Sequence, residues 1–228
     1  MMGKIDLLDH GFVRLVDHMG SDLSIARNAR VSYDAEWRAG EDEGSDARLI
    51  NYLYCNGHNT PFEAVTFTFD VKAPIFVFRQ WHRHRTQSYN ELSARYRPLP
   101  EEFYIPELAN VGVQSSDNKQ MRDMGESTIS QKDLGIMRDQ NHNAFALYQD
   151  LLEGGMPREI ARSVLPVSTY SHMFATMNLH NLFKFLGERM HEHAQYEIRV
   201  YANAILELIE PVVPVAVAAF RKNTLDKM

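Results

Sequence analysis

Side chains that could bind a charged ring compound are concentrated between Arg79 and Arg97. These nineteen residues hold five of the seventeen arginines of the chain and none of its lysines. Arginine presents a planar fork of donors that can bind a phosphate or an imide edge at two points, whereas lysine is a point charge. Aromatic and hydroxyl side chains are interleaved with the arginines, so the stretch predicts a site for planar rings that carry phosphates. The alternative is a solvated basic helix followed by a polar loop.

The segment that must position these side chains begins in an apolar run, Pro74–Phe78. If the chain continues as a helix, Gln80, Arg83 and His84 lie on one face of it. Polar groups on a rigid, buried element are what a binding site requires. The apolar run therefore favours a binding site over a solvated charge run.

The rest of the pattern predicts a mixed α/β (α+β) fold, with a mostly antiparallel central sheet flanked by helices. Residues 65–72 alternate strictly between apolar and polar, which is typical of a half-buried strand. Further strands are expected at 4–19 and 168–177. Helices are expected at 46–56, 132–153, 178–187 and 196–209, and Asp22 or Ser24 is expected to cap a short helix before them.

Two segments are predicted to be loops. Residues 39–45 are rich in glycine and acidic side chains. Residues 110–131 lose the apolar periodicity and predict a mobile polar surface loop. With no other boundary in view, residues 1–228 are expected to form a single domain.

Composition restricts the class of protein. The chain has 228 residues, 44% of them hydrophobic, which is enough for one large core. Its net charge of -6 makes it a poor candidate for non-specific nucleic-acid binding, so positive charge for an anionic ligand must be local. Cys55 is the single cysteine and is interpreted as a packing residue. The chain starts without the apolar core of a signal peptide, and Pro214 interrupts the apolar run Val212–Phe220. We therefore expect a soluble cytoplasmic protein without a membrane span.

Motifs for other chemistry are missing. The sequence contains no glycine-rich phosphate loop and no Gly-x-Ser-x-Gly elbow, so a nucleotide or a flavin would be held by side chains. His191 and His193 would point about 200 degrees apart on a helix, so no metal site is expected there. Because no activated nucleophile is evident either, the chemistry is expected to come from a cofactor.

Two blocks give the chain a family resemblance. Arg83-His84-Arg85, Ser88, Asn90-Glu91, Ser93 and Arg95-Tyr96 resemble the signature of flavin-dependent thymidylate synthases. His58, Thr60 and Glu63 are similar to a second block of the same family, and the resemblance extends over nearly the whole chain. It implies conversion of dUMP to dTMP, with methylenetetrahydrofolate as carbon donor and FAD, reduced by NADPH, as the source of hydride. It also implies no enzyme cysteine nucleophile, and a homotetramer with active sites shared between subunits.

The resemblance also implies roles for individual residues. Arg189 is expected to stabilise negative charge on the uracil ring and so to activate it. The residues expected to bind the nucleotide are Gln80, Arg83, Glu91, Leu92, Ser93, Ala94, Arg95, Arg162 and Arg189. The residues expected to contact the flavin are Thr60, Arg83, His84, Arg85, Thr86, Glu91, Asn178, His180, Lys184 and His193. Some family members have arginine at the position of His180 and asparagine at that of Lys184.

Two other hypotheses remain at this stage. One is a non-catalytic nucleotide- or RNA-binding module built on the basic stretch, although such a module would not need Arg162 and Arg189, which lie far away in sequence. The other is a metal-dependent hydrolase that uses His82, His84, His191 and His193. A metal analysis of the pure protein would separate the hydrolase from the flavoenzyme.

Overall fold

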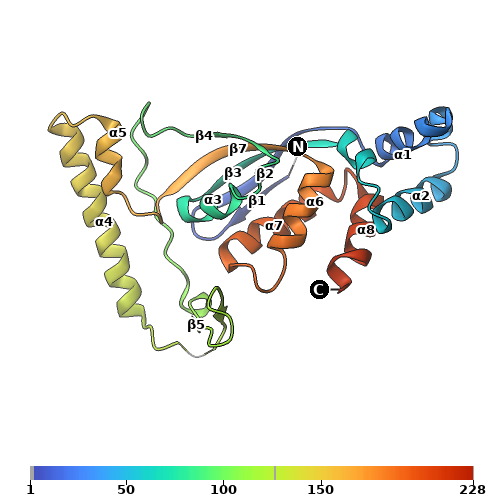
Figure 1. The fold of residues 1–228 in the computed structure, drawn as a ribbon. Coiled ribbons are helices and arrows are strands. Elements are labelled where there is room, and N and C mark those ends of the chain that lie inside the picture. The colour runs from blue at the N-terminus through green and yellow to red at the C-terminus, as the bar shows by residue number, and fades with distance from the viewer. Residues whose placement is uncertain (1–2, 126, 228) are drawn as a thin grey trace.

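A five-stranded antiparallel sheet forms the centre of the computed structural model, which describes residues 3–125 and 127–227 (Figure 1). Its strand order is β1-β2-β3-β7-β4. The strands span Lys4–Leu7 (β1), Gly11–Met19 (β2), Thr66–Pro74 (β3), Ser88–Glu91 (β4) and Tyr170–Asn178 (β7). The predicted antiparallel sheet is confirmed, and the basic stretch supplies its edge strand, β4.

The alternation in β3 decides which face of the sheet is buried. Phe67, Phe69 and Val71 are fully buried, and they pack with the apolar sides of the helices. The opposite face carries Asp70, which accepts a hydrogen bond from Arg14 at 2.5 Å and pairs with His172. Helices therefore cover one face of the sheet, and the other face is polar.

Three helices pack on the buried face: α3 (Ile75–Trp81), α6 (Leu179–Arg189) and α7 (Tyr196–Ile209). A fourth helix, α8 (Pro214–Asn223), packs beside α7 and shares the same core. The predicted helices at 178–187 and 196–209 correspond to α6 and α7. Trp81 is completely buried, and its ring stacks on Phe185 of α6 with centroids 4.7 Å apart. This contact fixes the end of α3, where the basic stretch begins, against α6.

A helical arm lies at one end of the sheet (Figure 1). It consists of α4 (Gln131–Glu153) and the short α5 (Arg158–Ala161), which share a small core with Phe103. The predicted loop at 110–131 contains a hairpin, β5 (Val113–Gln114) with β6 (Arg122–Asp123). Whether this segment is mobile stays a prediction.

A second lobe at the other end consists of α1 (Asp22–Arg30) and α2 (Glu43–Cys55) (Figure 1). The expected cap of α1 was wrong, because Ser21 is the N-cap and Asp22 instead accepts hydrogen bonds from the first turn of α8. The predicted loop at 39–45 was wrong at its end, because Asp42 caps a helix that begins at Glu43. Short polar caps shift helix starts by a few residues, which apolar periodicity does not detect.

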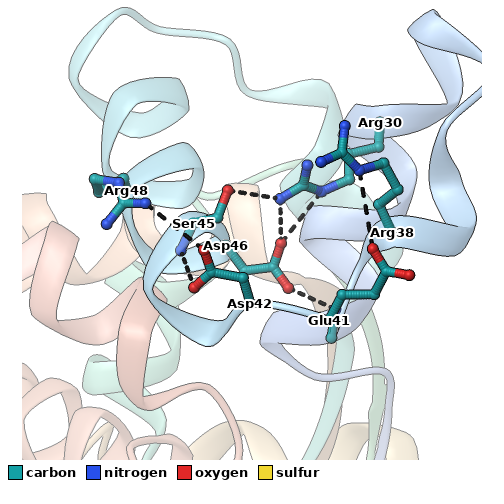
Figure 2. A network of polar contacts seen from close by, with 8 residues as sticks. Arg30, Arg38, Glu41, Asp42, Ser45, Asp46 and Arg48 are labelled. Carbon is teal, nitrogen blue, oxygen red and sulfur yellow. Dashed lines mark hydrogen bonds and ion pairs between the residues drawn. The ribbon is translucent and has the colours of Figure 1, made fainter.

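A network of polar contacts joins residues 30–48 within this lobe (Figure 2). Asp46 is 8% exposed, and it accepts hydrogen bonds from the Arg30 guanidinium at 2.5 Å and from the Gly40 backbone at 2.7 Å. Glu41 and Arg38 form a weaker, exposed pair at 3.9 Å. The buried pair therefore holds the 31–42 segment against α2.

We expect Asp46→Ala to lower the free energy of unfolding by about 2 kcal/mol, because it leaves the Arg30 charge buried without its partner. Urea unfolding of the variant measures this. Glu41→Ala is the matched control, with an expected loss below about 1 kcal/mol because its pair is solvated. Equal losses in the two variants would contradict the importance of the buried pair.

Candidate active site

The geometry of the site is centred on Arg189, the last residue of α6. Its Nε donates to Nε2 of His84 at 2.9 Å, and its Nη2 donates to the backbone oxygen of Gln80 at 3.3 Å. Its Nη1 takes part in none of the hydrogen bonds found among the described residues. Burial lowers the pKa of Arg189, yet an arginine stays charged at any physiological pH. The result is a fixed cation with donor capacity left for a ligand.

The turn that follows α3 places His84 beside this arginine. The hydroxyl of Tyr89 lies 2.8 Å from the His84 backbone oxygen and 3.2 Å from that of Trp81. The Trp81 indole donates to Gln87 Oε1 at 3.0 Å, which closes the turn. Because burial raises the pKa of Tyr89 to about 12, its hydroxyl keeps its proton and remains a donor. The turn is therefore held by side chains from both of its ends.

The expectation that Gln80, Arg83 and His84 share a helical face was wrong, because α3 ends at Trp81. The turn directs His84 inward, where it is 8% exposed and its ring lies 4.9 Å from that of Phe185. Arg83, Arg85 and Thr86 of the same turn are exposed. One turn thus gives a buried acceptor for Arg189 and a set of solvent-facing cations.

His84 is uncharged at neutral pH. Burial lowers its pKa from 6.5 to about 4, and the cations Arg189 and Lys184 act in the same direction, against Glu188. Neutral imidazole can accept from Arg189 through Nε2, whereas protonated imidazole would present a second donor to the guanidinium. Acid is therefore expected to break the contact between His84 and Arg189.

This shift gives a pH prediction. Unfolded chains take up a proton on this histidine near pH 6.5 and the folded protein does so only near pH 4, so the folded state is penalised between these values. The free energy of unfolding is expected to fall by up to about 3 kcal/mol as the pH drops through this window. Urea unfolding at several pH values measures the slope. His84→Gln keeps an acceptor but cannot titrate, so it should flatten the slope, and an unchanged slope would refute the assignment.

Five of the residues predicted to bind the nucleotide, Glu91 to Arg95, lie at the end of β4 and on the loop after it. Glu91 accepts from Ser171 at 2.6 Å, which fixes its carboxylate against β7. The backbone N–H of Leu92 donates to the backbone oxygen of His172, and the side chain of Ser93 accepts from the backbone N–H of Arg95. Ala94 is buried. These contacts fix the loop while its charged side chains stay at the surface.

The arm brings Arg162 toward this loop. Arg95 pairs with Glu159 of α5 at 3.6 Å, and Arg158 donates to the backbone oxygen of Tyr96 at 3.4 Å. Arg162 follows one helical turn after Arg158, is exposed, and forms no ion pair within the described residues. Arg95 and Arg162, which are far apart in sequence, thus lie on neighbouring segments, the loop after β4 and the end of α5.

Among the described residues, those predicted to contact the flavin border separate cavities of the chain. Thr60 borders a cavity of about 670 Å³ together with His58, Tyr33 and Tyr52. His180 and Lys184 border another of about 520 Å³. Asn178 caps α6 by accepting from the backbone of Asn181 at 2.9 Å. The structure therefore gathers Gln80, His84 and Arg189, and leaves Thr60 and His180 on separate cavities.

One expectation about the last third of the chain was wrong. His191 and His193 do not lie on a helix, because α6 ends at Arg189 and the chain bends before α7. His193 instead borders a cavity of about 570 Å³ beside the 113–123 hairpin. His191 and His193 are not splayed apart, and their rings lie 4.4 Å from each other. A helical geometry does not apply where the chain leaves the helix.

The interpretation of Cys55 as a packing residue was also wrong. It is exposed, donates to Asn223 Oδ1 at 3.1 Å and borders the cavity of His180 and Lys184. The buried residues of α2 are Asp46, Ile50 and Leu53, so the thiol faces away from the core. No group of three His, Cys, Asp or Glu side chains that could hold a metal ion occurs in residues 3–125 and 127–227. The hydrolase hypothesis therefore has no donor set in that part of the chain.

Sequence reasoning missed some residues that build the site. Gln195, at the start of α7, accepts from the side chain of Gln80, although 115 positions separate the two. Tyr89 ties the turn, and Ser171 holds Glu91. The alternation of β4 could have indicated that Tyr89 faces the core. Nothing in the sequence pairs Gln80 with Gln195.

Comparison with known proteins identifies the family of this chain. The family model described as thymidylate synthase complementing protein matches residues 14–215. The chain belongs to this family. A flavin-dependent thymidylate synthase from Thermotoga neapolitana is 47% identical over 219 residues, covering 96% of this chain and 94% of that protein. One from Treponema denticola is 46% identical over 223 residues, covering 96% and 82%.

A solved structure shares the fold of this chain. It is a UMP/dUMP methylase from Streptomyces cacaoi bound with 5-Br dUMP, with a TM-score of 0.86 and 39% identity. The match covers 96% of this chain and 98% of that one. Among the described residues, none of the helices combines the length and the apolar character needed to cross a membrane.

Proposed function

We propose that this protein is a flavin-dependent thymidylate synthase that methylates dUMP to dTMP. Methylenetetrahydrofolate would give the carbon, and FAD reduced by NADPH would give the hydride. The observation that carries the proposal is the contact of Arg189 with His84 and Gln80. It lies where α6 meets the turn after α3, here called the signature turn because it holds Arg83, His84 and Arg85 of the family signature. Membership of the family and the nucleotide-bound methylase structure support the same substrate.

Arg189 is the proposed catalytic residue. Carbon–carbon bond formation on uracil requires the ring to become electron-rich, and negative charge then develops on the imide. A guanidinium that is already positioned stabilises this charge without reorganisation. Two of its nitrogens are occupied by His84 and Gln80, so the remaining Nη1 is the group we assign to the imide. The neutral state of His84 keeps the arginine in this orientation.

The phosphate is assigned to the exposed arginines. Arg83 lies in the signature turn, whereas Arg95 and Arg162 come from the loop after β4 and from the arm. Fork-shaped donors from three segments suit a phosphate dianion. Glu91 and Ser93 are assigned to the sugar and the base, as polar groups held on the same loop.

The flavin is assigned to the residues that the resemblance indicates: Thr60, Arg83, His84, Arg85, Thr86, Glu91, Asn178, His180, Lys184 and His193. The donor set fits the cofactor, because exposed cations such as Arg85 and Lys184 can bind its diphosphate. When bound, FAD would supply the hydride that completes the methyl group. The protein residues contribute binding and orientation.

We also propose a homotetramer with shared active sites. The residues assigned to the flavin border separate cavities within one protomer, so a neighbouring subunit is needed to bring them together. The polar face of the sheet also exposes Phe174 and Met19, by 43% and 62%, as expected of an interface. Light scattering on the purified protein would give its mass. A monomeric mass would contradict this assembly. We place the enzyme in the cytoplasm, where NADPH and reduced folates are available to it.

The function is tested first by the visible spectrum of the purified protein. We expect a yellow protein, or one that becomes yellow with added FAD, and bleaching by NADPH without oxygen that dUMP accelerates. Product analysis with methylenetetrahydrofolate should then detect dTMP. A colourless protein that binds dUMP and ignores FAD would support the nucleotide-binding module instead. Bound metal together with hydrolytic activity would support the hydrolase.

A further inference from the structure

The hairpin of residues 113–123 is attached to α7 by a buried ion pair. Arg122 donates from Nη2 to Oε1 of Glu197 at 2.9 Å, and the side chain of Glu197 is 2% exposed. Tyr104 donates to the same oxygen at 3.0 Å. Burial raises the pKa of Tyr104, so its hydroxyl remains a donor. The Arg122 guanidinium also lies over the ring of Tyr196, 5.5 Å from its centroid.

This pair depends on both of its members. Oε2 of Glu197 and Nε of Arg122 are buried without a hydrogen-bond partner among the described residues. Removing the Arg122 side chain would leave the Glu197 charge buried and without compensation, which is far costlier than losing an exposed pair. The pair therefore acts as one unit and fixes the hairpin to the first turn of α7.

The same turn of α7 leads to the proposed catalytic arginine. Gln195 immediately precedes α7, and its side chain accepts from Gln80. The backbone oxygen of Gln80 accepts from Arg189 at 3.3 Å. A continuous series of contacts thus runs from Arg122 through Glu197 and the start of α7 to Gln80 and Arg189. The hairpin also encloses, with residues 192–196 and Arg199, the cavity bordered by His193.

We propose that Arg122 and Glu197 are positioning residues of the nucleotide site. Their ion pair docks the hairpin on the start of α7 and so holds Gln195, Gln80 and Arg189 in the arrangement that binds and activates the pyrimidine. The 110–131 segment then has a function that its polar sequence does not reveal. This inference rests on the proposed function.

The test compares Arg122→Ala with Lys119→Ala, which removes an exposed cation from the same hairpin. For Arg122→Ala we expect a rise of about tenfold or more in the KM for dUMP and a fall in kcat, with the flavin content unchanged. Tenfold corresponds to about 1.4 kcal/mol. We also expect faster cleavage of the hairpin by a protease. Lys119→Ala should match the wild type in all four measurements.

A lower melting temperature with unchanged KM and kcat would show a purely structural role and would overturn the proposal. If Arg122→Ala does not fold, Glu197→Gln and Arg122→Lys decide the question. Each keeps part of the contact, so each should show a smaller rise in KM, and wild-type constants in both would overturn the proposal. If the wild type itself neither binds dUMP nor forms dTMP, the proposed function fails. Protease cleavage then tests by itself whether the ion pair docks the hairpin on α7. Equal cleavage rates of the hairpin in Arg122→Ala and Lys119→Ala would refute that docking.

Discussion

Replacing Arg189 by alanine is expected to lower kcat for dTMP formation by about 10²–10³-fold. The substitution removes a cation that His84 and Gln80 hold in a fixed orientation. Because the stabilised charge develops in the transition state, the loss should fall mainly on kcat and less on the KM for dUMP. Anaerobic single-turnover assays, with the reduced flavin monitored by absorbance, measure the chemical step.

Two controls make this result specific. The flavin content of Arg189→Ala should match the wild type, because the residues assigned to the flavin lie mostly on other segments. Arg189→Lys keeps the charge and loses the fork that reaches both partners, so it should recover only part of the rate. Wild-type turnover in Arg189→Ala would reject the assigned role. Loss of flavin together with turnover would instead indicate a structural role for Arg189.

Replacing Arg83 by alanine is expected to weaken dUMP binding by 10- to 150-fold. A hydrogen bond to a charged group contributes roughly 1.5–3 kcal/mol, and each 1.4 kcal/mol corresponds to a factor of ten. Arg83 is exposed, so the protein should fold and melt like the wild type. Titration calorimetry with dUMP at fixed ionic strength measures the change.

The chain provides a matched control for Arg83. Arg79 is also exposed and precedes Arg83 by four residues, but it lies on α3, before the signature turn. Arg79→Ala should bind dUMP like the wild type. If both variants weaken binding equally, the effect comes from the general positive potential, and raising the salt concentration should then remove it. An unaltered titration for Arg83→Ala would contradict the phosphate assignment.

The sequence was sufficient where a local pattern controls the structure. The period-two alternation of residues 65–72 predicted β3, because burial of one face leaves a single register for a strand. The helical spacing at 196–209 likewise predicted α7 with the same bounds. The signature between Arg83 and Tyr96 predicted the family, since a ligand site requires particular side chains at fixed spacing.

Local sequence patterns failed where contacts between distant residues determine where a side chain lies. Because α3 ends at Trp81, His84 is buried and Arg83 is exposed, so the two do not share the helical face that was expected for them. The bend after Arg189 takes His191 and His193 off the helix on which they were expected. Cys55 lies on the exposed side of α2 and therefore faces away from the core. In each case either a helix ends, or packing decides which side of a helix is covered. Neither changes the spacing of apolar residues, so the spacing could not reveal it.

By itself, the sequence determined the strands β1, β2, β3 and β7, the long helices and the family, and it indicated residue types that suit a nucleotide and a flavin. It did not reveal β4 or the 113–123 hairpin. The tertiary structure decided which of those residues meet. Contacts such as Arg189 with His84, Gln80 with Gln195 and Arg122 with Glu197 join positions that are 75 to 115 residues apart. Such contacts depend on the packing of α3, α6 and α7 on one sheet face, and packing is a property of the whole core, which no short stretch of sequence encodes.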